Sequence, residues 1–81
     1  MRFEENERWA KAIDLNDQWS ASAERLGAGS LFVWDVSYSP TEDLQWIAQG
    51  EAASLEEAKK KMERAMTTLI RLQDSLKLEG D

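Results

Sequence analysis

The last third of the sequence runs from Ser54 to about Lys77 without a proline or a glycine, which strongly limits the folds open to the chain. Ser54 and Glu57 have the spacing of a capping box, in which the serine hydroxyl accepts the Glu57 amide and the glutamate reaches back. The pattern predicts a helix over about 54–77, roughly 24 residues and ~36 Å long. Because a strand of about eight residues spans only ~26 Å, this helix is longer than the sheet that it should cover.

The apolar residues of this segment follow the spacing of a heptad, with two further residues widening the stripe on one side. The heptad positions are Leu55, Ala58, Met62, Ala65, Leu69, Leu72 and Leu76, and the widening residues are Met66 and Ile70. In one interpretation the helix packs only on its own small sheet. In the other, its far end packs on a second copy or on another protein. The candidate interface residues are then Met66, Leu69, Ile70, Leu72 and Leu76.

Two alternating stretches precede the helix and predict a hairpin. In LFVWDVSYS, every second residue from Phe32 to Tyr38 is aromatic or aliphatic, as expected for a strand with one buried face. LQWIAQGE alternates in the same way after a turn at Pro40. We predict antiparallel strands over about 31–39 and 44–51, with Trp34 and Trp46 as cross-strand partners under the helix.

The first third of the chain has a different pattern. Residues 3–15 are good helix formers, and Trp9 and Ile13 stand four apart, so an amphipathic helix is predicted over about 3–15. DQWSASAERL alternates and predicts a strand over about 18–25. The predicted fold is a single two-layer α+β domain over residues 1–81, in the order α-β-β-β-α, with a three-stranded antiparallel sheet under the long C-terminal helix.

The composition argues against most kinds of catalytic and metal site. The chain has no cysteine and no histidine, which removes thiolate nucleophiles and the side chain most used for acid–base work near neutral pH. The carboxylate pairs lie in polar turns or at a helix end, where nothing raises a carboxyl pKa. These pairs are Asp14 with Asp17, Glu42 with Asp43, and Glu56 with Glu57. We therefore expect no enzymatic activity, no cofactor and no metal.

The net charge of −6 is unevenly distributed along the chain. Residues 31–53 contain four acidic residues and no basic one. These residues, Asp35, Glu42, Asp43 and Glu51, are candidate contacts for a basic partner surface. The same charge repels nucleic-acid phosphates. Apolar runs are too short for a membrane span and no export signal is evident, so we expect a cytoplasmic location without membrane contact.

The spacing S-x-x-x-A-K-x-x-M, from Ser54 to Met62, resembles the double-stranded-RNA-binding domain over roughly residues 31–69. In that family the final helix opens with a lysine pair directly after the serine, and those lysines contact phosphates. Leu55 and Glu56 occupy these positions here, and Glu57 follows. Because these acidic side chains repel phosphates, nucleic-acid binding is the weakest of the functional alternatives.

A second resemblance covers FVWDVS and the later stretch WIAQGEAASLEEAKKKMERAM. Small proteins encoded by phages and prophages of Gram-negative bacteria are similar, with a tryptophan-rich hairpin that leads through G-x-A-x-S-x-E-E-A into a helix. The resemblance implies a non-enzymatic protein–protein interaction module that inhibits a host or defence protein, as anti-CRISPR proteins do, through an acidic or apolar surface. The alternative is a homodimeric accessory protein that associates through its C-terminal helix.

Overall fold

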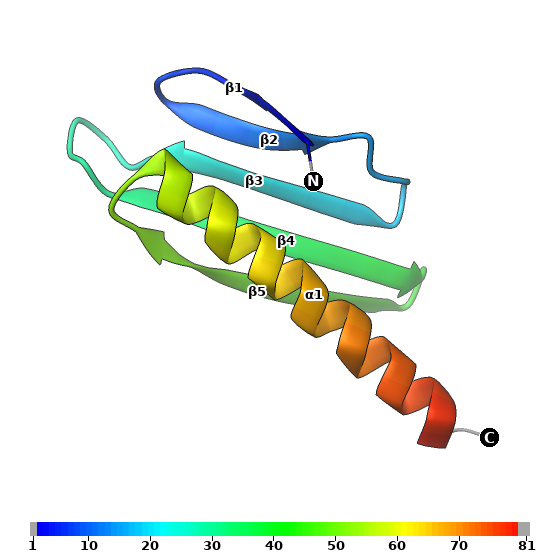
Figure 1. Ribbon diagram of the computed structural model, residues 1–81. Helices are drawn as coiled ribbons and strands as arrows, with labels where there is room; N and C mark the ends of the chain where they lie inside the picture. Colours follow the sequence, from blue (N-terminus) through cyan, green and yellow to red (C-terminus); the bar gives the residue numbers. More distant parts are fainter. Residues whose placement is uncertain (1, 80–81) are drawn as a thin grey trace.

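The computed structural model describes the backbone of residues 2–79 and the side chains of residues 2–75, and shows one antiparallel sheet with a helix across one face (Figure 1). The strands are β1 (Arg2–Glu5), β2 (Trp9–Ile13), β3 (Trp19–Arg25), β4 (Phe32–Thr41) and β5 (Leu44–Ala52), and the helix is α1 (Leu55–Glu79). The strands are neighbours in chain order, so the sheet is a meander with β1 and β5 at its edges.

The predicted order α-β-β-β-α is wrong, because the described chain folds as five strands followed by one helix. The difference lies entirely in the first third of the chain. From β3 onward, the observed strands and α1 begin and end within about two residues of the predicted bounds. Residues 31–69, over which the chain resembles the double-stranded-RNA-binding domain, fold as β4, β5 and the first part of α1.

A β-hairpin replaces the helix predicted over about 3–15. Its turn is fixed by Asn6, whose side-chain oxygen accepts the backbone amides of Arg8 and Trp9 at 2.8 and 3.1 Å. Such a local side-chain bond offers the backbone an alternative to helical hydrogen bonds. The four-residue spacing of Trp9 and Ile13 did not discriminate, because residues four apart share one face in a strand as well as in a helix.

The core lies between α1 and the side of the sheet that faces it. Met62 and Val36 are fully buried there, and burying a side chain of this size contributes about 1.5–3 kcal/mol. The strands β2 and β3 present small side chains to this layer, which allows the helix to approach closely. The buried residues are Ala10, Ala12, Ala21, Ala23, Phe32, Val36, Tyr38, Ala52, Ala58, Met62 and Leu69.

Aromatic rings fill the helix side of the sheet, but Trp34 and Trp46 are not the cross-strand partners that the sequence predicted. Trp46 is opposite Tyr38, and Trp34 is opposite Gly50. Tyr38 stacks on Trp19 with ring centroids 4.2 Å apart and meets the Trp46 ring edge-on at 6.2 Å. Both predicted core tryptophans nevertheless pack against the core cluster.

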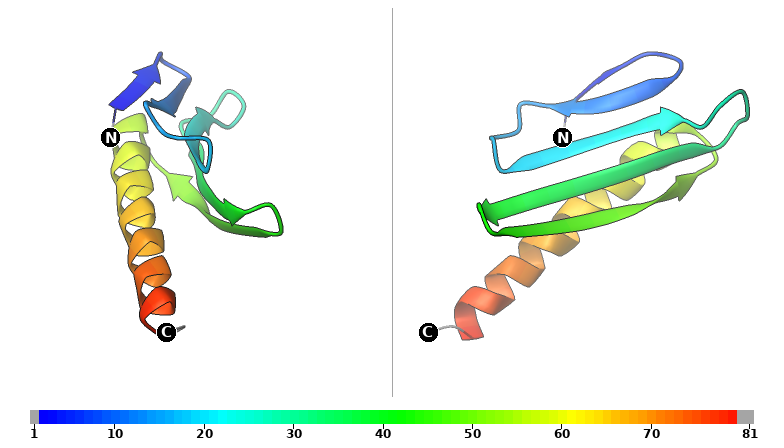
Figure 2. Two further views of the ribbon diagram at one scale, coloured as in Figure 1. Left: turned by 90° about the vertical axis from the view of Figure 1, so that its right-hand side faces the viewer. Right: turned by 180° about the vertical axis from the view of Figure 1, so that it is seen from behind.

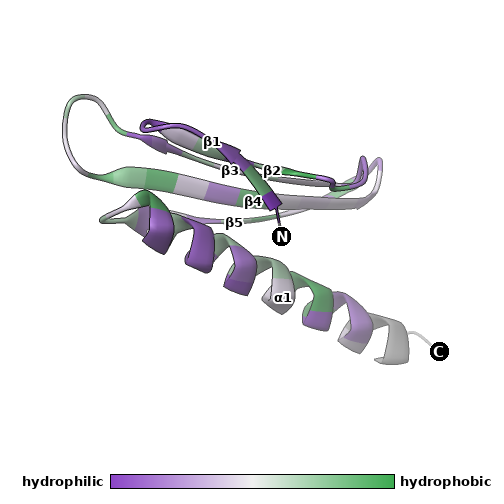
Figure 3. Ribbon diagram, turned by 45° about the horizontal axis from the view of Figure 1, so that its top comes forward, coloured by the Kyte–Doolittle hydropathy of each residue, from purple (hydrophilic) through white to green (hydrophobic). Residues whose placement is uncertain are grey.

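The helix runs diagonally across the sheet and continues past β5 (Figures 1 and 2). Leu69 is buried against the strands, whereas Leu72, one turn later in the same stripe, is 51% exposed. Figure 3 shows hydrophobic and hydrophilic segments alternating along α1. The whole molecule is elongated, with extents of 49 × 21 × 20 Å.

Candidate interaction surface

The side of the sheet that faces away from α1 carries no helix in the described chain (Figure 2). Because side chains alternate along a strand, the residues that are not directed toward α1 all project here. The strand registers arrange them in three rows. We call this surface the open face. Its first row contains Trp9, Glu24, Val33 and Glu51, and its second row contains Lys11, Ser22, Asp35 and Gln49. Its third row contains Ser20, Ser37 and Ile47.

The open face is hollowed across β2, β3, β4 and β5, with a volume of about 660 Å³. Four large apolar residues line this hollow: Trp9, Val33 and Ile47, which project from the open face, and Trp34, which also packs against the core cluster. Ile47 is 57% exposed, and the other three are half-buried. Tryptophan is the residue type most enriched among the side chains that dominate binding energy at protein interfaces. The hollow therefore offers an aromatic and aliphatic anchor site on an otherwise polar surface.

Hydroxyl groups and charged side chains of both signs surround these apolar residues. Ser22 donates to Asp35 across the β3–β4 pair at 3.2 Å, and the hydroxyls of Ser20 and Ser37 lie 2.8 Å apart. Carboxylates outnumber ammonium groups in the three rows, because Glu24, Asp35 and Glu51 are opposed only by Lys11. The open face thus has a negative balance, which suits a partner surface with basic side chains.

The four acidic residues predicted as contacts are divided between two places. Asp35 and Glu51 project from the open face, on β4 and β5. Glu42 and Asp43 lie in the exposed turn that joins these strands. Just before this turn, the Pro40 carbonyl in β4 accepts the Gln18 side chain from the β2–β3 connection at 3.3 Å. The acidic segment is therefore not one continuous surface.

The five helix residues predicted as contacts are also divided. Leu69 is part of the core, and Met66 is half-buried against it. Ile70 and Leu72 are 43% and 51% exposed. The side chain of Leu76 lies outside the described residues. Only Ile70 and Leu72 are thus both described and exposed enough to contact another chain.

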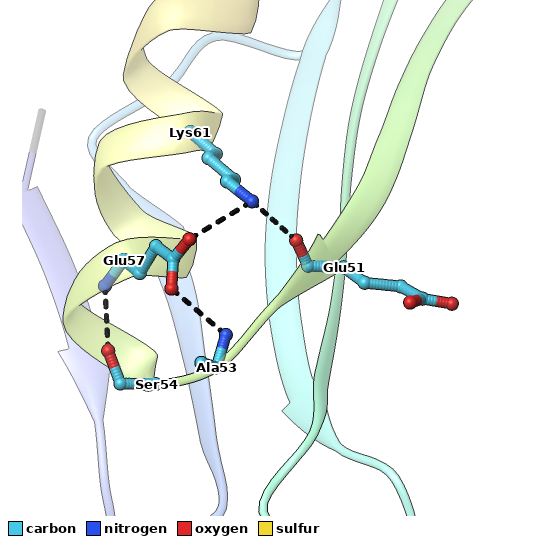
Figure 4. A network of polar contacts seen from close by, with 5 residues as sticks. All are labelled: Glu51, Ala53, Ser54, Glu57 and Lys61. Atoms are coloured by element: carbon cyan, nitrogen blue, oxygen red, sulfur yellow. Dashed lines mark hydrogen bonds and ion pairs between the residues drawn. The ribbon is translucent and has the colours of Figure 1, made fainter.

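The start of α1 is fixed by a polar network rather than by a ligand (Figure 4). Ser54 Oγ accepts the Glu57 amide at 3.1 Å, as the capping box predicts. The Glu57 carboxylate accepts the Ala53 amide at 3.0 Å, one residue before the expected donor. Lys61 Nζ contacts this carboxylate at 3.1 Å and donates to the Glu51 carbonyl at 2.8 Å. The hydrogen bond from the Ala53 amide is the main cause that lowers the pKa of Glu57, and Lys61 lowers this pKa further.

Lys59 joins the helix to the first strand. Its ammonium lies 2.7 Å from carboxylate oxygens of both Glu5 and Glu56, and 5.8 Å from the centre of the Phe3 ring. These contacts, Glu5 first, raise the pKa of Lys59, and Lys59 lowers the pKa of Glu56. The Lys59 side chain is only 18% exposed, although both of its carboxylate partners are more accessible. Two of the three consecutive lysines are therefore already neutralised within the fold.

Sequence reasoning did not find the hollow of the open face. Trp9 was assigned to a helix, although the alternation of Trp9, Lys11 and Ile13 also fits a strand. Val33 and Ile47 were placed correctly on strands but on the side opposite the aromatic residues, where no role was assigned to them. The signal that could have identified this surface is the combination of large apolar residues on the second face of both hairpin strands.

Comparison of the chain with protein-family models, with curated proteins and with solved structures finds no match. Among the described residues, no group of three or more acidic side chains is arranged to hold a metal ion. The described helix is not apolar enough over sufficient length to cross a membrane.

Proposed function

We propose that the chain is a non-enzymatic protein–protein interaction module that binds its partner with the open face. The observation that carries this proposal is the presence of Trp9, Val33 and Ile47 around one hollow on a face without a covering helix. Large apolar side chains that a fold does not use in its own core are typical of partner-binding surfaces.

The partner that fits this surface best is a protein with a basic patch next to an apolar projection. The apolar group would enter the hollow, and basic side chains would meet Glu24 and Asp35 at its rim. Charge complementarity of this kind accelerates association and excludes acidic partners. The chain would act in the cytoplasm of a host cell as an inhibitor of a host or defence protein, as the resemblance to small phage proteins implies.

Site-specific photo-cross-linking tests which face contacts the partner. A photoreactive residue at Ser22, in the hollow, should cross-link a host protein in a lysate. The same residue at Arg64, on the exposed side of α1, serves as the matched control. Cross-linking from Arg64 but not from Ser22 would place the interface on the helix and refute the proposal.

Charge reversal tests the chemistry of the contact. Binding of the captured partner should weaken with Glu24→Lys in the hollow and with added salt, whereas Asp43→Lys on the distant turn should change it little. Trp9→Ala should weaken binding more strongly, by on the order of 2 kcal/mol if Trp9 is an anchor. Equal effects of the two lysine variants would mean that only the net charge matters.

A further inference from the structure

The two edges of the sheet differ in how they are protected. β1 has four residues, three of them charged, and Lys59 ties it to the helix through Glu5. β5 has nine residues, with no lysine, no proline and only Glu51 as a charge. Short length, charges and prolines are the devices by which edge strands avoid pairing with other chains. β5 is long, has no proline and carries a single charge, so it is the edge that is less protected against pairing with another strand.

The backbone groups on this edge can be assigned from one contact. The Glu51 carbonyl accepts Lys61 Nζ, so it points away from β4 (Figure 4). In an antiparallel strand, the N–H and C=O of one residue point to the same side and those of alternate residues agree. Gln45, Ile47 and Gln49 therefore present their backbone donors and acceptors outward, along an edge where the described sheet has no further strand.

This edge is suited to pairing with itself. When two identical strands pair antiparallel about a two-fold axis, the central residue lies opposite the same residue of the second copy. A residue before the centre then lies opposite the residue that is equally far after the centre. Centred on Ala48, the middle of β5, the pairing sets Ile47 opposite Gln49 and Gln45 opposite Glu51 of the second copy, whose carbonyl also accepts Lys61. No like charges then face each other. A shift to a centre at Ile47 would instead set Glu51 against Asp43 of the second copy.

The position of α1 is an independent reason to expect a second copy of the chain beside β5. The turns of α1 that carry Leu72 project past β5, on the helix side of the sheet (Figure 1). A second copy paired along β5 would extend the sheet on the side past which these turns project. A second copy would bring a second projecting helix in the opposite direction on the same side, so that Leu72 and Ile70 of both chains gain apolar neighbours.

We propose that the chain forms a two-fold dimer in which β5 pairs with β5 of a second copy, centred on Ala48, and the projecting ends of the two α1 helices cover the joined sheet. The dimer leaves the open face accessible, because the pairing uses backbone groups at the edge. It does not depend on the partner proposed above, and each proposal can fail without the other.

Cysteine cross-linking tests the pairing directly, because the chain contains no cysteine. In the proposed register, residue 48 is opposite itself at a position where antiparallel strands approach closely, with Cα atoms about 4.5 Å apart. Ala48→Cys should therefore give a disulfide-linked dimer under mild oxidation. Glu4→Cys, on the other edge of the sheet, is the matched control and should remain monomeric under reducing and oxidising conditions alike.

Substitutions that change the charge at position 45 test the proposed register. Gln45→Glu would face Glu51 of the second copy twice per dimer and should weaken the dimer roughly two- to tenfold, whereas Gln45→Lys should strengthen it by a similar factor. Light scattering after gel filtration measures both. A monomer at ~100 μM for the wild-type chain, where a micromolar dimer would be almost fully formed, overturns the proposal. Equal cross-linking of Ala48→Cys and Glu4→Cys overturns it as well.

Discussion

Gly50 is the residue at which the sheet is most closely fitted to a side chain. The Trp34 indole lies over it from the neighbouring strand, and a Cβ atom at position 50 would lie 2.9 Å from Trp34 Cζ2 and 3.1 Å from its Nε1. A ring held between α1 and the sheet has little room to move away. The absence of a side chain at Gly50 is thus what allows Trp34 to pack flat.

Gly50→Ala should therefore destabilise the fold by about 1–3 kcal/mol, since the indole must shift out of a packed layer. Urea unfolding followed by tryptophan fluorescence measures the loss. Gly29→Ala is the matched control, because a Cβ atom there would meet nothing closer than 3.8 Å. If both variants unfold at the same urea concentration, the Trp34 contact does not constrain position 50.

Lys59 has a comparable role at the other edge of the sheet. Replacing it in Lys59→Met removes the ammonium that joins Glu5 on β1 to α1. Amide hydrogen exchange in β1 should become faster while β4 and β5 keep their protection, because an edge strand of four residues has few other attachments. Lys60→Met, one residue along and exposed, should leave the exchange of β1 unchanged.

The first turn of α1 makes stability depend on acid. The Ala53 amide and Lys61 lower the pKa of Glu57 below the usual 4.5. A carboxylate whose pKa is lowered in the folded state stabilises that state above the unfolded value, and this contribution is lost as the pH falls through the lowered value. Unfolding free energies measured from neutral pH to below 4.5 should fall less steeply in Glu57→Gln than in the wild type. Glu63→Gln, on the exposed side of the helix, should retain the wild-type slope.

The two halves of α1 should respond differently to the same truncation. Leu69→Ala removes a core side chain and should cost about 2–5 kcal/mol. Leu72→Ala alters the projecting part, so in the monomer it should cost less than about 0.5 kcal/mol. Thermal unfolding of dilute protein compares them. A large loss in dilute Leu72→Ala would mean that Leu72 supports the isolated fold rather than a contact between chains.

Across the whole molecule, the sequence predicted an element correctly wherever its apolar residues fitted the two-residue period of a strand or the 3.6-residue period of a helix, but not both. β4 alternates over its buried residues Phe32, Val36 and Tyr38, and α1 has a cap and a stripe, so both were predicted with nearly their observed bounds. The helix predicted over about 3–15 was wrong because the glutamates of this segment favour a helix, whereas Asn6 closes a turn. The burial of Ala10 and Ala12, which required the hairpin, depends on a helix more than forty residues away and has no local signal.

The candidate surface was less predictable than the fold for a related reason. Asp35 and Glu51 were recognised as candidates from charge alone, but their position beside Trp9 and Val33 depends on the registers of three strand pairs. A chain with the first segment folded as a helix would have had no hollow there. Which side of a hairpin remains uncovered becomes known only when the path of α1 is known.

The order of the elements along the chain also determines how the protein is made. All five strands leave the ribosome before α1, and until the helix follows, the rings of Phe32, Tyr38 and Trp46 have no layer to pack against. An incomplete chain with exposed apolar surface and an open strand edge is the kind of species that aggregates or binds chaperones. Until α1 has also emerged from the ribosome, the strands therefore expose apolar surface that chaperones can bind, and packing of α1 on the sheet completes the fold.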